Sequence, residues 1–466
     1  MKQNTNSMLD FTQGSIPKHL FDFTIPLFLG NLLQTFYNTV DSIWVGRFLG
    51  PQALAAVSVS FPIIFVLVSF VMGITMATTV LVAQYKGARR EDMVKKTINN
   101  SMLLLLIGAL TVSIFGISFN RQILKLMNTP DSLIPMASGY LNVFLGGLVF
   151  MFGYNVTSAI LRGLGDSRTP LIFLTYSTAI NMALDPLLIF GIGPIPKMGI
   201  IGAAVATIIS QAISFYLAVR YLDRSNHLIT IKFREMKFDM ELTKLTIKIG
   251  LPAGIQHTVI SLGQTVMMSL VNTFGPLVVA SYGAAVKIQS FAFMPGMSIG
   301  MAVSSLTGQN IGAGREDRIR EIVKWAMVLT LVIIGFVALV IAVFPKQLLL
   351  MFTKDDMVLK QGAHILRILS VSYIPFGLMW VANGVLRGAG DTFITMVISI
   401  VSLWGIRIPL AVYLARFTPL GSTGIWAAMA IGSFISMFLT WGYYLTGRWK
   451  GKSAVKKGYR LKYSEE

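Results

Sequence analysis

Two acidic residues of this 466-residue chain, Asp41 and Asp185, stand inside long apolar stretches. The other 18 of its 20 acidic residues lie in loops, in tails or at the ends of such stretches. A charge in the middle of a membrane costs roughly 3 kcal/mol on insertion scales, so such a residue usually faces a polar cavity and has a function. Both aspartates lie toward the same side of the membrane, which allows a shared site.

Polar neighbours accompany each aspartate on its own helix face. Tyr37 precedes Asp41 by one turn, and Asn181 precedes Asp185 by four residues, a spacing that brings side chains together on a helix. Two more polar groups are expected at similar depth in other spans: Asn155 and Thr207. The alternative is a structural role, because buried polar groups also form hydrogen bonds that hold membrane helices together.

The elements that must carry these residues are membrane-spanning helices. Apolar residues make up 54% of the chain and charged residues only 13%, about half the charge of a soluble domain. A continuous apolar run of about 20 residues can cross a bilayer as a helix, unlike the alternating segments of a β-barrel. An all-α polytopic membrane protein with twelve spans is predicted: 20–46, 53–83, 94–118, 135–160, 170–191, 199–221, 243–273, 278–307, 322–344, 362–386, 393–415 and 422–446.

Prolines stand inside the first and seventh of these spans. Pro26 and Pro252 each lack a backbone N–H and would bend their helix. Pro26 lies about four turns before Asp41, so bending linked to protonation of that aspartate is a further hypothesis.

Lysine and arginine are distributed unevenly between the loops. With a cytoplasmic N-terminus, 28 of the 39 basic residues fall inside and eight outside, as the positive-inside rule requires. The net charge of +19 then reflects topology and attraction to anionic lipids rather than nucleic-acid binding. Both termini are predicted to be cytoplasmic. The first apolar stretch lacks a small-residue cleavage site and is expected to remain as a span.

The chain repeats itself at a constant offset. QYKGARRED at 84–92 returns as QNIGAGRED at 309–317, and LRGLGD at 161–166 returns as LRGAGD at 386–391. Each unit holds six spans, an even number, so the two form parallel repeats related by an axis along the membrane normal. The predicted organisation is an N-terminal lobe, a cytoplasmic linker, a C-terminal lobe and a basic cytoplasmic tail: 1–222, 223–242, 243–446 and 447–466.

These duplicated motifs and this topology resemble the multidrug and toxic compound extrusion (MATE) family over nearly the whole chain. The resemblance implies a secondary active antiporter that exports amphipathic or cationic organic compounds, driven by influx of H⁺ or Na⁺, through alternating access of two lobes. It also implies a proton or sodium site formed by aspartates of the first and fifth helices with nearby Asn and Thr. Asp41, Asp185 and Asn181 match those positions well, and Asn155 and Thr207 match less closely.

The C-terminal lobe departs from one branch of the family. Shifting the two aspartates by the offset of the repeated motifs gives Val266 and Leu410, which cannot ionise. NorM-like members carry acidic residues in this lobe, so the resemblance is closer to the DinF-like branch, and H⁺ is favoured over Na⁺. Lys287 and Arg407 are the deep charges of this lobe, with either a gating or a packing role.

Other functions fit the sequence less well. A lipid-linked saccharide flippase of the same wider superfamily would need a strongly cationic cavity, for which only the two deep basic residues exist. An intramembrane enzyme would need a catalytic constellation, yet the chain has no cysteine and only four histidines, with no ligand pair. We expect no cofactor beyond the coupling ion. The expected partners are small organic cations or drugs and membrane lipids, with no nucleic acid, for a monomer in the cytoplasmic membrane of a prokaryote.

Overall fold

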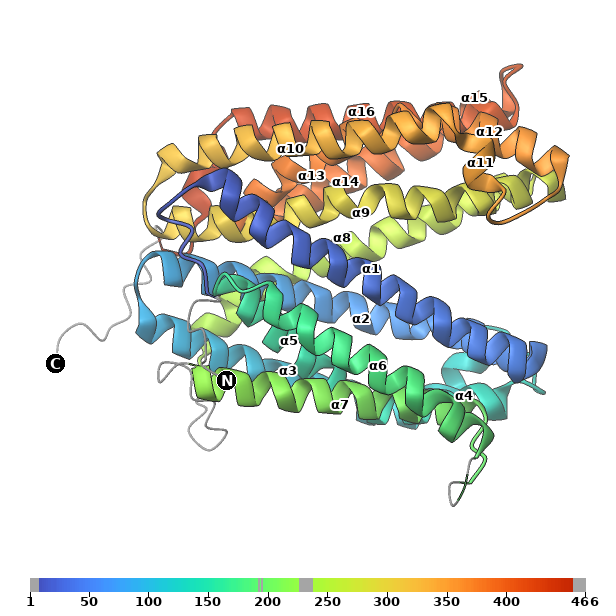
Figure 1. The fold of residues 1–466 in the computed structure, drawn as a ribbon, viewed down its shortest axis with the longest axis horizontal. Coiled ribbons are helices and arrows are strands. Elements are labelled where there is room, and N and C mark those ends of the chain that lie inside the picture. The colour runs from blue at the N-terminus through green and yellow to red at the C-terminus, as the bar shows by residue number, and fades with distance from the viewer. Residues whose placement is uncertain (1–7, 192, 194–195, 226–237, 456–466) are drawn as a thin grey trace. The chain divides into compact units, whose positions relative to one another are not determined.

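The computed structural model describes the chain apart from residues 1–7, 192, 194–195, 226–237 and 456–466. The residues that it describes form helices and no strand (Figure 1), which confirms the all-α prediction. The first repeat contains these helices: α1 (Ile16–Phe48), α2 (Gly50–Gly87), α3 (Glu91–Leu126), α4 (Ile134–Gly146), α5 (Leu148–Gly163), α6 (Arg168–Phe190) and α7 (Ile200–Ser225). The second repeat contains these: α8 (Met240–Asn272), α9 (Pro276–Gly312), α10 (Glu316–Val343), α11 (Pro345–Leu349), α12 (Asp356–Ser370), α13 (Tyr373–Gly388), α14 (Thr392–Ile400), the π-helix η2 (Val401–Arg407), α15 (Ile408–Arg416), α16 (Ser422–Leu445) and the 3₁₀-helix η3 (Arg448–Lys452).

In the described part of the chain, ten of the twelve predicted membrane passages coincide with helices that are long and apolar enough to cross a bilayer. Eight of these are continuous helices, and two are bent helix pairs. The remaining two are α1 and α8, with 33 residues each. At 1.5 Å per residue each is about 50 Å long, which is enough to span the membrane. Neither is among the helices of the described chain that are apolar enough to do so, so these two passages stay predictions.

The fourth and tenth spans are bent where continuous helices were predicted. α4 and α5 meet at 47° across Gly147, and α12 and α13 meet at 43° just before Tyr373. The bend is therefore a feature of both repeats. The π-helix at Val401–Arg407 interrupts the eleventh span just before Pro409, whose missing backbone N–H removes one helical hydrogen bond. Pro26 and Pro252 lie inside α1 and α8, and bending there stays a prediction.

Each copy of the QxxGAxRED motif ends one helix and begins the next. It joins α2 to α3 in the first repeat and α9 to α10 in the second. The Glu–Asp pair of the motif forms the first turn of the following helix in both copies. Acidic side chains are favourable there because the N-terminus of a helix carries partial positive charge.

Glycine allows equivalent helices to approach closely in both repeats. A Cβ on Gly163 would lie 2.8 Å from the carbonyl oxygen of Thr79, and a Cβ on Gly388 would lie 2.5 Å from that of Ser304. The first contact joins α5 to α2, and the second joins α13 to α9. The two glycines are separated by the same offset as the repeated motifs, so the repeats share a packing contact as well as a motif.

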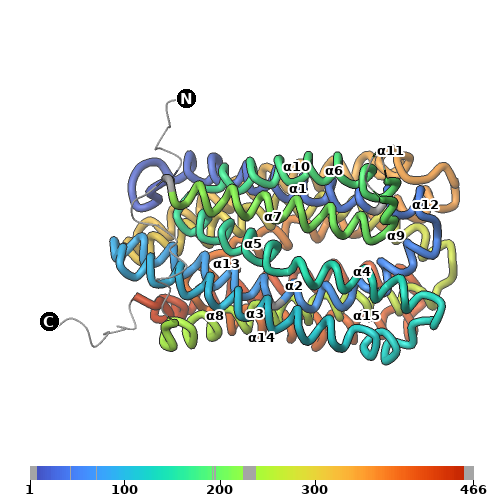
Figure 2. The backbone as a smooth tube through the Cα atoms, turned by 90° about the horizontal axis from the view of Figure 1, so that it is seen from below, coloured from blue at the N-terminus to red at the C-terminus, as the bar shows by residue number. Residues whose placement is uncertain are grey.

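The chain divides into two compact units. One comprises Met1–Leu9, Leu29–Lys86 and Arg90–Leu251, and the other comprises Asp10–Phe28, Gly87–Arg89 and Pro252–Glu466. In the first unit α7 packs against α4, α5 and α6 (Figure 2), and in the second α9 packs against α10, α12 and α13. The predicted lobe boundaries stay a prediction, and most of the predicted linker, 226–237, lies outside the described residues.

Candidate functional site

A hydrogen bond joins the first and last helices of the first repeat at Tyr37. The Tyr37 hydroxyl of α1 donates to Thr207 Oγ1 of α7 at 3.0 Å, and Thr207 Oγ1 donates to the carbonyl of Ala203 at 3.1 Å. Because Tyr37 stands one turn before Asp41, this bond also orients the helix face that carries the aspartate. Two predicted site residues that lie 170 positions apart are thus in direct contact.

Asn181 and Asp185 form the polar face of α6. Asn181 Nδ2 donates to Asp185 Oδ1 at 3.3 Å, as the four-residue spacing predicts, and both side chains are fully buried. Thr178 is also buried on this face, and its hydroxyl has no hydrogen-bond partner within the described chain. The spacing of three and seven residues to Asn181 and Asp185 is a signal that could have identified Thr178 from the sequence.

Each aspartate keeps one buried carboxylate oxygen without a hydrogen-bond partner among the described residues. These oxygens are Asp41 Oδ1 and Asp185 Oδ2. The two carboxylates are close enough to interact through their charges. An ionised carboxylate removed from water is costly unless it is paired, and two of them repel each other. The arrangement therefore favours the uptake of a proton or a cation.

Tyr140 of α4 is a further member of this group that the sequence did not point to. Its side chain is buried, and its hydroxyl lies within electrostatic range of both Asp41 and Asp185. Tyr37 has the same relation to the two carboxylates. A single tyrosine inside an apolar run carries no informative spacing, so only the packing of α4 reveals it.

Asn155 is not joined to this group. Its side chain is exposed, and its Nδ2 donates to the carbonyl of Met151 on its own helix, at 2.8 Å. Pro26 occupies a buried position on α1, in the stretch of that helix that belongs to the second unit. The roles predicted for Asn155 and Pro26 stay predictions.

Close packing of α6 against α7 positions the polar groups of both helices. A Cβ on Gly202 would lie 2.6 Å from the carbonyl oxygen of Leu188, so only glycine permits this approach. Leu188 follows Asp185 by three residues, and Gly202 precedes Thr207 by five. The contact therefore sets the distance between the helix faces that carry the site.

The donors at this site are oxygen atoms of carboxylate, amide, hydroxyl and phenol groups. Such donors suit a proton or a hard cation such as Na⁺. In the part of the chain that the structure describes, no three His, Asp or Glu side chains gather in a way that could hold a metal ion. A proton or a monovalent cation at Asp41 and Asp185 is compatible with these oxygen donors.

The comparison with protein families settles the assignment. A family model described as MatE matches the chain twice, at residues 26–187 and at residues 252–413. The chain belongs to the MATE family. The two matched segments are equally long, and one follows the other at nearly the offset of the repeated motifs, which confirms the internal repeat. MATE members are transporters and not enzymes.

Relatives of the chain carry the names of multidrug resistance proteins. It is 35% identical over 449 residues to the probable multidrug resistance protein YoeA of Bacillus subtilis, covering 96% of both chains. It is 26% identical to the probable multidrug resistance protein NorM of Thermotoga maritima, again covering 96% of each. The fold matches a crystal structure of MATE in complex with MaD3S, with a TM-score of 0.88, 24% identity, and coverage of 98% of this chain and 100% of that one. The closer resemblance to the DinF-like branch stays a prediction.

Proposed function

We propose that this MATE protein is a secondary active antiporter that exports amphipathic or cationic organic compounds in exchange for H⁺, with Na⁺ as the alternative coupling ion. The observation that carries the proposal is the pair of half-buried Asp41 and buried Asp185, in which each carboxylate keeps one buried oxygen without a partner in the described chain. The names of the relatives support the class of substrate. We expect a monomer in the cytoplasmic membrane of a prokaryote, with both termini inside.

Coupling needs a group whose affinity for the ion differs between the inward-facing and the outward-facing state. An ion that binds both states equally does not change the equilibrium between them. Protonation of one carboxylate, or Na⁺ between the two, removes the repulsion within the pair. The polar faces of α1 and α6 can then close on each other, and deprotonation separates them again. Ion entry and substrate exit would share this cycle. H⁺ is favoured because the second repeat lacks an acidic residue in its predicted spans.

Export should follow the proton gradient. A drug-sensitive host that expresses the protein and is loaded with a fluorescent lipophilic cation should lose the dye faster than the host alone. Collapse of the pH gradient should stop this export, and removal of Na⁺ should change it little. Export that needs Na⁺ and ignores the pH gradient would reassign the coupling ion, and export that ignores both gradients would contradict antiport.

The hydrogen bond between Tyr37 and Thr207 should contribute to transport as one unit. Tyr37→Phe and Thr207→Val each remove one partner of a bond worth about 0.5–1.5 kcal/mol, which corresponds to roughly a two- to tenfold change in rate. The double variant should be no slower than the slower single variant, because both changes remove the same bond. Initial export rates at equal membrane content measure this, and additive losses would show that the side chains act separately.

A lipid-linked saccharide flippase is the alternative function. It would need free cationic groups in a central cavity, yet both deep basic residues of the second unit are engaged in packing. Lys287 Nζ lies 5.5 Å from the centre of the Phe352 ring. The side chain of Arg407 packs against Gly432, so closely that a Cβ on this glycine would lie 2.6 Å from Arg407 Nε. Accumulation of a lipid-linked precursor on deletion, with unchanged drug tolerance, would favour the flippase.

A further inference from the structure

The turn after the second helix of each repeat contains one residue with a left-handed backbone. This residue is Gly314 in the second copy, with φ +72°, and Arg89 in the first copy, with φ +57°. Glycine adopts this conformation readily, whereas a residue with a Cβ is strained in it. The first copy therefore holds an arginine at a position where its own repeat shows glycine to be the unstrained choice.

Arg89 lines a pocket of about 350 Å³ in the second unit. Arg315, Thr12 and Gln13 line it as well, together with the short glycine–alanine ends of α2 and α9. Within the described chain, this lining contains two guanidinium groups, a hydroxyl and an amide, but no carboxylate. A lining of this kind suits a ligand with negatively charged oxygen atoms.

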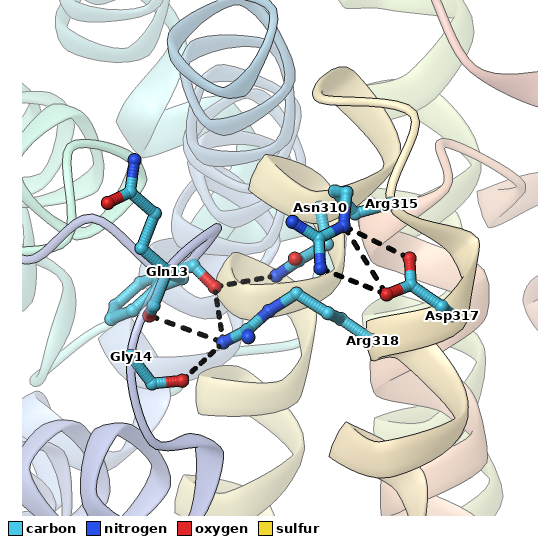
Figure 3. A network of polar contacts seen from close by, with 7 residues as sticks. Gln13, Gly14, Asn310, Arg315, Asp317 and Arg318 are labelled. Carbon is cyan, nitrogen blue, oxygen red and sulfur yellow. Dashed lines mark hydrogen bonds and ion pairs between the residues drawn. The ribbon is translucent and has the colours of Figure 1, made fainter.

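A network of hydrogen bonds fixes one wall of the pocket, the segment 11–14 (Figure 3). The Phe11 N–H donates to Gln309 Oε1 at 3.0 Å. Asn310 Nδ2 donates to the Phe11 carbonyl at 3.1 Å, one of the bonds drawn in Figure 3. Arg318 Nη2 donates to three carbonyl oxygens of the segment, the shortest contact being 2.9 Å. This wall is therefore in place before any ligand enters.

The rest of the lining is fixed by glycine packing and by an ion pair. A Cβ on Gly87 would lie 1.9 Å from the carbonyl oxygen of Gln309, so the two helix ends touch through their backbones. Arg315 donates from Nε and Nη2 to the carboxylate of Asp317, at 3.1 and 3.0 Å. These bonds lower the pKa of Asp317, and they leave Nη1 of Arg315 for a ligand.

Arg89 is the uncompensated charge of the pocket. Its side chain is exposed, and it has no ion-pair partner among the described residues, whereas the neighbouring Arg90 pairs with Asp92 at 3.9 Å. The carboxylate of Asp10 is occupied within its own segment, where it accepts from the N–H and the hydroxyl of Thr12 at 2.9 and 2.6 Å. The charge of Arg89 is therefore available to a ligand.

We infer that this pocket binds an oxyanion of the phosphate type, with Arg89 as its main contact and Nη1 of Arg315 as the second. The chemistry fits the phosphate of an anionic lipid headgroup and a free phosphate equally well. The basic loops at this end are predicted to face the cytoplasm, where anionic lipids attract such groups. Binding gives a reason for arginine at a strained position, because its planar guanidinium forms paired bonds to phosphate that glycine cannot form.

The test measures the thermal unfolding temperature of the full chain in nanodiscs. One arm uses phosphatidylcholine nanodiscs with inorganic phosphate, against sodium chloride at equal ionic strength. The other arm uses nanodiscs that contain phosphatidylglycerol, without phosphate. A ligand that binds only the folded protein should raise the unfolding temperature by at least about 2 °C, and the arm that responds identifies the source of the oxyanion.

Variants at two neighbouring positions make the test specific. Without the anion, Arg89→Gly should unfold at the wild-type temperature or above it, because the backbone strain is gone, and it should lose the anion-dependent rise. Arg89→Lys should keep part of the rise, and Arg90→Gln, the matched control outside the lining, should keep all of it. If Arg89→Gly cannot be purified, Arg89→Gln replaces it, since it removes the charge and keeps the Cβ.

Two results would overturn the inference. One is an Arg89→Gly or Arg89→Gln protein that responds as strongly as the wild type. The other is a wild-type protein that chloride stabilises as much as phosphate does and that phosphatidylglycerol leaves unchanged. Neither outcome depends on transport, so the pocket and the antiport proposal fail or succeed separately.

Discussion

Asp185→Asn and Asp41→Asn are each expected to abolish gradient-driven export while the protein still inserts into the membrane. Asparagine keeps the volume of the side chain and removes the charge that can change during the cycle. Apart from Asp22 at the start of the first span, the predicted spans hold no third acidic residue that could take over, so the export rate should fall by more than about tenfold. The measurement is the initial rate of dye export at matched membrane content.

Loop acids provide matched controls for these variants. Asp131→Asn changes an exposed turn residue, and Asp355→Asn changes the N-cap of α12, which accepts from the Val358 N–H at 3.1 Å. Asparagine caps a helix about as well as aspartate does, so both controls should export at close to the wild-type rate. If the two variants within the spans also export normally, the coupling group lies elsewhere, and His257 is the first residue to replace.

Gly388→Val is expected to destabilise the second unit strongly. A Cβ at this position would lie 2.5 Å from the carbonyl oxygen of Ser304 and 2.9 Å from the Cβ of Thr307. A backbone carbonyl cannot move aside unless α9 and α13, which pack closely, separate. Overpacking of this kind costs about 1–3 kcal/mol or more. Thermal unfolding of the purified protein should show a loss of several degrees or a failure to accumulate.

The same substitution at an open position separates packing from helix propensity. Gly335 lies on α10, and a Cβ there would meet no atom within 4 Å. Gly335→Val should therefore leave the unfolding temperature close to that of the wild type. Equal unfolding temperatures for the Gly388 and Gly335 variants would contradict the close contact between α9 and α13.

The helices and their order could be predicted because they depend on patterns that run along the whole chain. Continuous apolar runs define the spans, and motifs such as LRGLGD at 161–166 return at a constant offset. The pairing of Asn181 with Asp185 was also predictable, because four residues make about one turn of a single helix. For Tyr37 and Thr207 the sequence predicted a similar depth in the membrane. It did not predict that their side chains touch.

The features that escaped prediction depend on packing between helices. The break at Gly147 falls at a glycine pair inside an apolar run, and its counterpart before Tyr373 is followed by Pro375. Glycine and proline are both tolerated within membrane helices, so neither fixes a bend by itself. Tyr140 comes within electrostatic range of the aspartates only through the packing of α4 against α3 and α7. Asn155 was assigned to the site because of its expected depth in the membrane. Depth does not determine which way a side chain faces, and the side chain of Asn155 is exposed.

Proton movement that accompanies substrate movement tests the central claim most directly. Purified protein in proteoliposomes with an enclosed pH-sensitive dye would receive a lipophilic cation on one side. The account predicts that the wild type moves protons in the direction opposite to the cation, and that Asp41→Asn and Asp185→Asn move neither. Transport of the cation by the wild type without any flux of H⁺ or Na⁺, or counter-flow at the wild-type rate in both variants, would contradict it.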